Sequence, residues 1–149
     1  MVYRIYFSAP LFSQAEKDFN EKIVKLLEDI KEDGKQLYQV FLPQRDGFEA
    51  ARLQGLRGDD KAKKIFEKDI SEVENADILF MVTDGYVPDD GACVELGYAY
   101  AKGKRCYALS TDGRSFMKDM TLNPLLTGCF LRIFKSVEEL KDFLKKNKL

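Results

Sequence analysis

The feature that most limits the fold is residues 76–82, Ala-Asp-Ile-Leu-Phe-Met-Val, which are apolar at nearly every position. A strand with one face in water alternates apolar and polar residues, and this segment does not alternate. Continuous apolar strands are typical of the middle of a parallel sheet that helices cover on both faces. The segment therefore predicts a buried central strand in an α/β fold.

The rest of the chain alternates between strand and helix patterns, which extends this prediction to the whole sequence. Strands are expected at residues 2–7, 38–42, 105–109 and 129–134, and helices at 14–31, 60–75, 91–102 and from Ser136 onward. Gly34 is expected to cap the first helix, and Ser136 with Glu139 forms a capping-box pattern. We predict one domain over residues 1–149, with an open parallel five-stranded sheet in flavodoxin-like (Rossmann-like) order and helices on both faces.

Three loops follow the expected strands and are the places to look for a ligand site. In open α/β sheets, ligands bind beyond the carboxyl ends of the strands. The loops span residues 7–13, 41–60 and 83–91. Residues 43–60 contain several glycines and no clear period, so we expect a long irregular loop there.

The absence of histidine narrows the possible chemistry. It removes Ser-His and Cys-His nucleophile systems and the common metal-ligand patterns. Three cysteines without a CxxC pair argue against a disulfide framework or a zinc site and favour a reducing cytoplasm. Chemistry here must use carboxylates, lysine, tyrosine, cysteine or a bound cofactor.

The charge balance argues against nucleic acid or a membrane surface as a partner. The chain has 24 basic and 25 acidic residues and a formal net charge of -1. Such a balance offers no attraction to phosphate backbones or anionic lipids. No apolar run approaches the roughly 20 residues that span a bilayer.

Four acidic residues, Asp84, Asp89, Asp90 and Glu95, lie within twelve positions after the central strand. Asp89 or Asp90 is expected to cap the following helix. Glu95 differs because its neighbours are small or apolar, and an isolated carboxylate there costs several kcal/mol without a partner or a role. It lies about one turn inside the helix N-terminus, which favours the ionised form by roughly 0.3–1 kcal/mol. Glu95 is therefore predicted to be a nucleophile or charge stabiliser.

Two glycines flank Glu95 on the same helix. Gly91 permits close backbone approach at the helix start, and Gly97 removes a side chain where a ligand or a strand presses. Helix packing explains either glycine taken alone. The combination Asp-x-Gly-x-x-x-Glu-x-Gly from Asp89 to Gly97 points to a ligand site.

With this motif the chain resembles the nucleoside 2-deoxyribosyltransferases. Two further segments carry the resemblance in the expected order: residues 5–12, Ile-Tyr-Phe-Ser-Ala-Pro-Leu-Phe, and residues 68–70, Lys-Asp-Ile. The Asp-x-Gly-x-x-x-Glu-Leu-Gly-Tyr-Ala segment is the most specific of the three. The similarity in segment order extends from residue 5 to about residue 134.

The resemblance implies a transferase that moves 2-deoxyribose between purine or pyrimidine bases. Glu95 would attack the anomeric carbon to form a covalent 2-deoxyribosyl-enzyme, and a second base, or water, would then complete the reaction. Tyr6 matches the tyrosine that orients the nucleophile, and Asp69 and Asp89 match the acids that hold and protonate the departing base. Asn123 matches a residue that reaches the sugar 5′-hydroxyl in a neighbouring subunit's site, so a homo-oligomer is expected.

The expected partners are deoxynucleosides and free nucleobases, with no cofactor and no metal. Phe12, in the first ligand-facing loop, is a candidate to stack on the base. Gln44 or Asp46 is expected to touch the base, with the register left open between them. Gly91 is expected to border the substrate at the helix start.

Two other functions remain open. The first is a hydrolase of the same fold that acts on deoxynucleoside 5′-monophosphates, whose phosphate would need Ser, Arg or helix N-terminal amides. The first loop has Ser8 and Ser13 but no cation before Lys17, which favours a free 5′-hydroxyl. The second is a non-enzymatic nucleotide-binding module, since fold alone does not fix function. The acidic residues count against it, because they repel phosphate.

Overall fold

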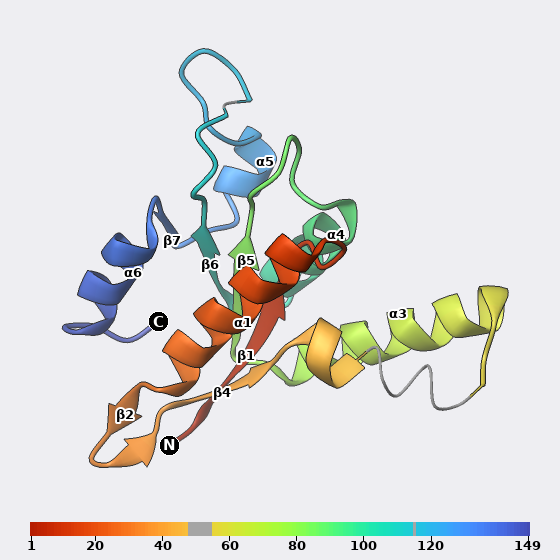
Figure 1. Ribbon diagram of the computed structural model, residues 1–149, viewed down its shortest axis with the longest axis horizontal. Helices are drawn as coiled ribbons and strands as arrows, with labels where there is room; N and C mark the ends of the chain where they lie inside the picture. Colours follow the sequence, from red (N-terminus) through yellow and green to blue (C-terminus); the bar gives the residue numbers. More distant parts are fainter. Residues whose placement is uncertain (48–54, 115) are drawn as a thin grey trace.

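A computed structural model of the protein describes residues 1–47, 55–114 and 116–149. Five parallel strands form the main sheet in the order β4-β1-β5-β6-β7. Their bounds are β1 Tyr3–Ser8, β4 Tyr38–Phe41, β5 Ile78–Val82, β6 Arg105–Leu109 and β7 Arg132–Phe134. Counted along the chain, this order is 2-1-3-4-5, so the predicted flavodoxin-like sheet is confirmed (Figure 1).

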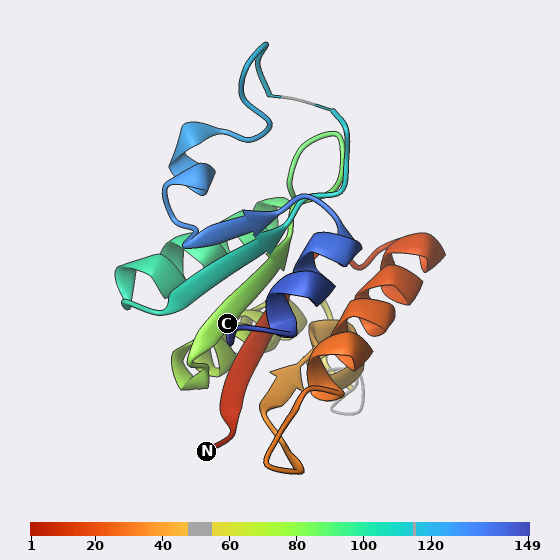
Figure 2. The same ribbon diagram turned by 90° about the vertical axis from the view of Figure 1, so that its left-hand side faces the viewer.

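Helices cover both faces of the sheet. Their bounds are α1 Gln14–Glu28, α3 Gly58–Asn75, α4 Asp90–Ala101, α5 Pro124–Thr127 and α6 Val137–Leu144. Side chains of α1 and α6 pack with one set of buried strand residues, and those of α3 and α4 pack with the other. Figure 2 shows α1 and α6 together on one side of the sheet. Of the helices in the described ranges, none has the length and apolar character needed to cross a membrane.

Strand β5 is buried at every position, as its apolar sequence predicts. Alternate side chains point to opposite faces of a strand, so Ile78 and Phe80 join the α1 side while Leu79 and Met81 join the α3 and α4 side. The prediction of a central strand covered on both faces is confirmed.

The first helix is shorter than its apolar period suggests. It ends at Glu28 and is followed by a small antiparallel hairpin, β2 Lys31–Glu32 with β3 Lys35–Gln36. Asp33 and Gly34 have φ values of 50° and 76° and form the turn between these strands. Asp-Gly readily adopts the two left-handed conformations of a tight hairpin turn. The prediction that Gly34 caps the helix is therefore wrong.

The segment expected to be one irregular loop from residue 43 to residue 60 has more structure than its composition suggests. Pro43–Gly47 form a short π-helical turn, η1, and α3 begins at Gly58, two residues earlier than expected. Residues 48–54 of the expected loop lie outside the described residues. A single helical turn is too short to show a hydrophobic period, so the sequence pattern does not reveal it.

The last strand is also shorter than predicted. The backbone N–H groups of Cys129 and Phe130 donate to the carbonyls of Leu126 and Thr127, so these residues continue the turn after α5. Strand β7 consequently begins at Arg132 and not at residue 129. The four-residue helix α5 was not expected, because it carries no measurable period.

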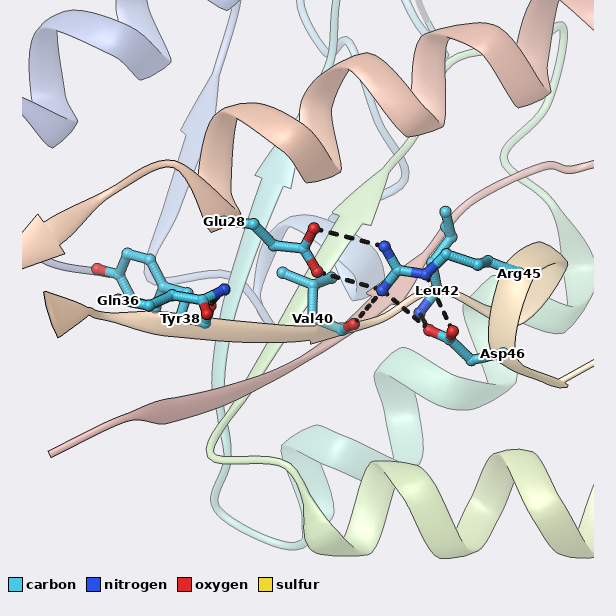
Figure 3. A network of polar contacts seen from close by, with 7 residues as sticks. All are labelled: Glu28, Gln36, Tyr38, Val40, Leu42, Arg45 and Asp46. Atoms are coloured by element: carbon cyan, nitrogen blue, oxygen red, sulfur yellow. Dashed lines mark hydrogen bonds and ion pairs between the residues drawn. The ribbon is translucent and has the colours of Figure 1, made fainter.

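Side chains cover the outer edge of strand β4 (Figure 3). The Gln36 amide donates to Tyr38 O at 2.8 Å, the Arg45 guanidinium donates to Val40 O at 2.7 Å, and Leu42 N donates to the Asp46 carboxylate at 2.8 Å. The backbone groups in these three bonds, Tyr38 O, Val40 O and Leu42 N, point away from β1. Exposed strand edges invite pairing with other chains, and this network occupies three of the groups involved.

The same network fixes η1 against the sheet. Arg45 pairs with Glu28 of α1 at 3.1 Å and with Asp46 at 2.9 Å, so one guanidinium joins a helix, the strand edge and the π-helical turn. Asp46 raises the pKa of Arg45 through its hydrogen bond, and Glu28 adds to the rise. Gly47, the last residue of η1, is thereby held at the end of β4.

Candidate active site

The carboxylate of Glu95 lies at the carboxyl end of β1, where two hydroxyl groups bind it. The Tyr6 hydroxyl donates to Oε1 at 2.7 Å and the Ser8 hydroxyl donates to Oε2 at 2.5 Å. Tyr6 and Ser8 are two residues apart on one strand, so both side chains point to the face that carries α4. Both are fully buried. Each oxygen of the predicted nucleophile therefore has its own donor.

Helix α4 positions Glu95 beside this strand end. Ala92, Leu96 and Ala99 bury one side of the helix against the sheet, and Asp89 caps its N-terminus. Glu95 is the sixth residue of the helix, in its second turn. The helix dipole acts mainly within the first turn, so it stabilises the carboxylate less than the sequence position suggested.

Burial is the main influence on the charge of Glu95. It raises the pKa of Glu95 to about 7, against the hydrogen bonds from Ser8 and Tyr6, which lower it. The negative charges of Asp69 and Asp89 add to the rise. Among the described residues, no lysine or arginine pairs with this carboxylate. The ionised form is thus poorly solvated, a state that favours bonding to an electron-poor carbon.

Asp69, from α3, is the second carboxyl group at this site. Burial raises its pKa to about 6, while a hydrogen bond with Tyr6 and the charge of Lys68 lower it. A Cβ built on Gly47 would lie 3.5 Å from Asp69 Oδ1, so η1 packs closely beside the carboxyl group. Asp69 can therefore carry a proton near neutral pH, as a general acid requires.

Tyr6 links the two carboxyl groups. Its hydroxyl binds Glu95 and also interacts with Asp69, and burial together with these two negative charges raises the pKa of Tyr6. Its ring stacks on Phe41 with 5.6 Å between centroids. The Lys68 ammonium lies over the Phe41 ring, 5.3 Å from its centroid, and pairs with Glu72 at 2.6 Å. This lysine is consequently engaged beside the site and does not neutralise Glu95.

Asp89, and not Asp90, caps α4. Its Oδ2 accepts a hydrogen bond from Ala92 N at 2.8 Å. A Cβ on Gly91 would lie only 3.2 Å from this oxygen, so glycine leaves room for the capping carboxylate. Gly97 is exposed, and apart from its chain neighbours and the backbone of its own helix no described residue has an atom within 4 Å of the place of its Cβ. The idea that a strand presses on Gly97 is therefore wrong.

The remaining predicted substrate contacts are exposed to solvent or already engaged with other groups of the protein. Phe12 is 75% exposed. The Gln44 side chain accepts from Asn20 at 3.0 Å and donates to Lys17 O at 3.1 Å. Asp46 binds Arg45 and Leu42 N. Contacts between these side chains and a base stay predictions.

Asn123 occupies a different part of the molecule. Its side-chain oxygen accepts from Leu125 N at 2.9 Å and caps α5. It lines a pocket of about 340 Å³ together with Cys93. Cys93 is two residues from Glu95, or about 200° around the helix, so this pocket lies on the other side of α4. Within one chain, Asn123 does not join the residues around Glu95.

Ser8 and Gly47 are site residues that the sequence did not assign. Ser8 was considered only as a possible phosphate ligand, although its spacing of two from Tyr6 on one strand places both hydroxyls on the same face. Gly47 carries no comparable signal. In the described segments, no three or more Cys, Asp or Glu side chains are arranged to hold a metal ion.

Solved structures share this fold over nearly the whole chain. A conserved protein from Enterococcus faecalis V583 is 28% identical, covers 98% of this chain and 99% of its own, and gives a TM-score of 0.77. A 2-deoxyribosyltransferase from Bacillus psychrosaccharolyticus is 22% identical over 93% of this chain and 90% of its own, with a TM-score of 0.73. A CMP N-glycosidase from Clostridium botulinum is 18% identical over 95% and 97%, with a TM-score of 0.58.

The sequence itself also matches a family. A search of curated proteins found no match. In contrast, the profile of the nucleoside 2-deoxyribosyltransferases matches residues 5–141, which include the residues that surround Glu95. The match covers most of the chain and agrees with the resemblance seen in its motifs. This protein belongs to the nucleoside 2-deoxyribosyltransferase family.

Proposed function

We propose that this protein transfers the 2-deoxyribosyl group between nucleobases by double displacement through a covalent deoxyribosyl-Glu95 intermediate. Family and fold support a deoxyribosyltransferase or a related N-glycosidase activity. The observation that carries the finer proposal is the partly buried Glu95 carboxylate, which two hydroxyls hold and with which no described lysine or arginine pairs. A shielded carboxylate without a paired cation is costly to ionise, and such groups cluster at functional sites.

In the first step, a Glu95 oxygen attacks the anomeric carbon of the donor nucleoside. The bond from this carbon to the base nitrogen breaks, and its electron pair goes to the base. A base anion is a poor leaving group until a ring nitrogen is protonated, and Asp69 supplies that proton. Burial raises the pKa of Asp69 to about 6, nearer to neutral pH, and because the pKa of Glu95 is about 7 the step requires that the proton lies on Asp69 and not on Glu95 when the substrate is bound. Asp89, whose Oδ2 caps α4, is proposed to help hold the base through its second oxygen.

In the second step, a new base attacks the same carbon and the ester bond to Glu95 breaks. The Asp69 carboxylate takes the proton that the incoming nitrogen loses, which restores both groups. Two displacements at one carbon retain the configuration of the sugar, as in retaining glycosidases. Tyr6 orients Glu95 in both steps through its bond to Oε1.

The test is to incubate the protein with a deoxynucleoside and a different free base. Formation of the exchanged nucleoside supports the transferase. Mass spectrometry after mixing with donor alone should find one 2-deoxyribosyl group on the peptide that contains Glu95, and none in a Glu95→Ala variant. Exchange without any adduct on this peptide would contradict the covalent route.

The second candidate is the related hydrolase, in which water takes the place of the incoming base. The CMP N-glycosidase of similar fold favours it. For a 5′-monophosphate substrate, Ser8 and Ser13 were the expected phosphate ligands. However, Ser8 binds Glu95, and Ser13 accepts from Glu16 N at 3.2 Å to cap α1. Release of free 2-deoxyribose without exchange, even at high concentrations of acceptor base, would move the assignment to the hydrolase.

We further propose that the active form is a homo-oligomer in which Asn123 reaches a neighbouring subunit's site. The separate pocket that Asn123 lines within its own chain supports this, because the lining of that pocket does not include Glu95, Tyr6, Ser8 or Asp69. Sedimentation of the active protein should show an oligomer. A fully active monomer would refute this part.

A further inference from the structure

The hydroxyl of Ser8 is buried and directed at the nucleophile. Ser8 is the last residue of β1, and its backbone is held in register with Met81 of β5. The side chain is fully inaccessible, and its oxygen lies 2.5 Å from Glu95 Oε2. A buried hydroxyl on a short hydrogen bond to a carboxylate is a charge-assisted contact, which is stronger than one between neutral groups.

Tyr6 and Ser8 differ in how many groups they serve. The Tyr6 hydroxyl interacts with both Glu95 and Asp69. It has one proton and can donate to one carboxylate at a time. Among the described residues, the Ser8 hydroxyl donates to Glu95 and to no other side chain. Ser8 is therefore the donor reserved for the nucleophile.

The charges on the two carboxyl groups exchange during the proposed reaction. The proposed reaction requires that, before cleavage, Glu95 is the anion and Asp69 carries the proton, which is the reverse of the order given by their pKa values of about 7 and about 6. After cleavage, Glu95 is a neutral ester and Asp69 is the anion. The Tyr6 hydroxyl, which the two carboxyl groups share, is then expected to turn from Glu95 to Asp69, because a hydrogen bond to the charged group is the stronger one. A second, fixed donor is then needed to hold the Glu95 side chain in place.

We propose that Ser8 is this fixed donor: a positioning residue that holds Glu95 Oε2 and favours its carboxylate form, which leaves Tyr6 free to stabilise Asp69. The proposal rests on the proposed function for the roles of the two carboxyl groups. The contact itself and its effect on the charge of Glu95 do not depend on which acceptor the enzyme uses.

Loss of the Ser8 hydroxyl should make ionisation of Glu95 harder. Among the described residues, the charged or titratable groups that act on Glu95 are Tyr6 of β1, Asp69 of α3 and Asp89 at the start of α4, and none of these three is a cation. The hydroxyls of Ser8 and Tyr6 lower the pKa of Glu95 against burial. Removing a hydrogen bond to a charged group is expected to raise the titration midpoint by about one pH unit.

The first arm of the test is a titration that needs no substrate. The protein is labelled with ¹³C at glutamate carboxyl carbons, and the Glu95 signal is assigned by its loss in Glu95→Gln. Ser8→Ala should raise the midpoint of this signal by about one pH unit. Ser8→Thr, which keeps a hydroxyl, should stay near the wild-type value. Ser110→Ala is the matched control, since Ser110 is a buried serine that follows β6 and does not contact Glu95.

The second arm measures kcat and KM for exchange across pH. Ser8→Ala should lower kcat about tenfold at pH 6, where fewer molecules carry the anion, and lower it less above pH 8. KM should change little, because the hydroxyl faces Glu95 and not the substrate. Ser8→Cys, which has a weak donor of similar size, should behave like Ser8→Ala.

The proposal is overturned if Ser8→Ala leaves both the Glu95 midpoint and the pH profile at wild-type values. It is also overturned if Ser110→Ala shifts the midpoint equally, because the effect would then be a general loss of packing. If the wild-type protein neither exchanges nor hydrolyses deoxynucleosides, the proposed function fails. The titration arm would still decide whether Ser8 controls the charge of Glu95.

Discussion

Two groups of carboxylates in this protein are built in opposite ways. At the edge of β4, Glu28 and Asp46 surround the guanidinium of Arg45. At the end of β1, Glu95 and Asp69 surround the hydroxyl of Tyr6, and Ser8 provides the only other described side-chain donor to Glu95. The first group is partly exposed and includes a cation. The second is largely buried, and the lysine beside it, Lys68, pairs with Glu72 and not with Glu95 or Asp69.

The difference supports the proposal that the first group serves the fold and the second serves chemistry. In the Arg45 group, opposite charges satisfy each other, and the same guanidinium closes the edge of β4. In the Glu95 group, burial destabilises the ionised forms of both carboxyl groups and so raises their pKa values. Proteins keep such unfavourable arrangements mainly at functional sites, where reactivity depends on them.

The largest expected effect is the loss of activity in Glu95→Gln. An amide is not a nucleophile at carbon, so base exchange should fall by at least about a thousandfold while the fold is retained. Initial rates of exchange measure this, and circular dichroism checks the fold. Turnover near the wild-type rate would show that the Glu95 group is not the chemical centre.

Asp69→Asn should have the next largest effect. Loss of a general acid typically costs 10² to 10⁴ in rate, and we expect about a hundredfold or more with ordinary bases. The loss should shrink for donors whose base carries electron-withdrawing groups, since these leave without protonation. An equal loss for all leaving groups would instead indicate that Asp69 acts in binding.

The stability of Glu95→Gln should depend on pH. The folded-state pKa of Glu95, about 7, lies above its ordinary value of 4.5. Between these two values the folded state holds a proton that the unfolded state has lost, so wild-type stability falls as pH rises from about 4.5 to about 7. Relative to wild type, Glu95→Gln should be more stable by about 1–3 kcal/mol at pH 8 and nearly equal at pH 4. Urea unfolding at both values measures the difference.

The smallest effect is expected for Arg45→Ala. Its ion pairs are partly exposed, and its main buried contact is the hydrogen bond to Val40 O. Stability should fall by about 1 kcal/mol, and the titration midpoint of Glu95 should not move. Urea unfolding and the carboxyl ¹³C signal test the two parts. A shift of the Glu95 midpoint would mean that the two groups are coupled through η1 and Gly47.

Elements with long, strong patterns were predictable from the sequence. Residues 78–82 are apolar throughout and lie in the sheet centre, and the helical period of α1 and α3 is clear. Short elements were not, because α5, η1 and the β2–β3 hairpin span too few residues to show a period. The Asp-Gly pair at residues 33–34 was a hairpin signal that the expected helix cap obscured.

In the candidate site, too, one residue was predictable from the sequence and its neighbours in space were not. Glu95 was identifiable because a carboxylate among small and apolar residues needs a partner or a role, and the motif around it suggested which. Its partners were less accessible to sequence reasoning. Tyr6 and Asp69 came from the family resemblance, and Ser8 was mentioned only as one of two serines in the first loop.

The sequence by itself determined that histidine chemistry is absent and that an acid lies in an apolar helix beyond a buried strand, and from this it predicted a carboxylate as the reactive group. Only the tertiary structure decided which groups surround it. Ser8 and Glu95 are 87 positions apart, and the contact between them depends on the pairing of β1 with β5 and the packing of α4 on the sheet. Hydrogen bonds between residues so distant follow from the fold as a whole, and no local pattern encodes them.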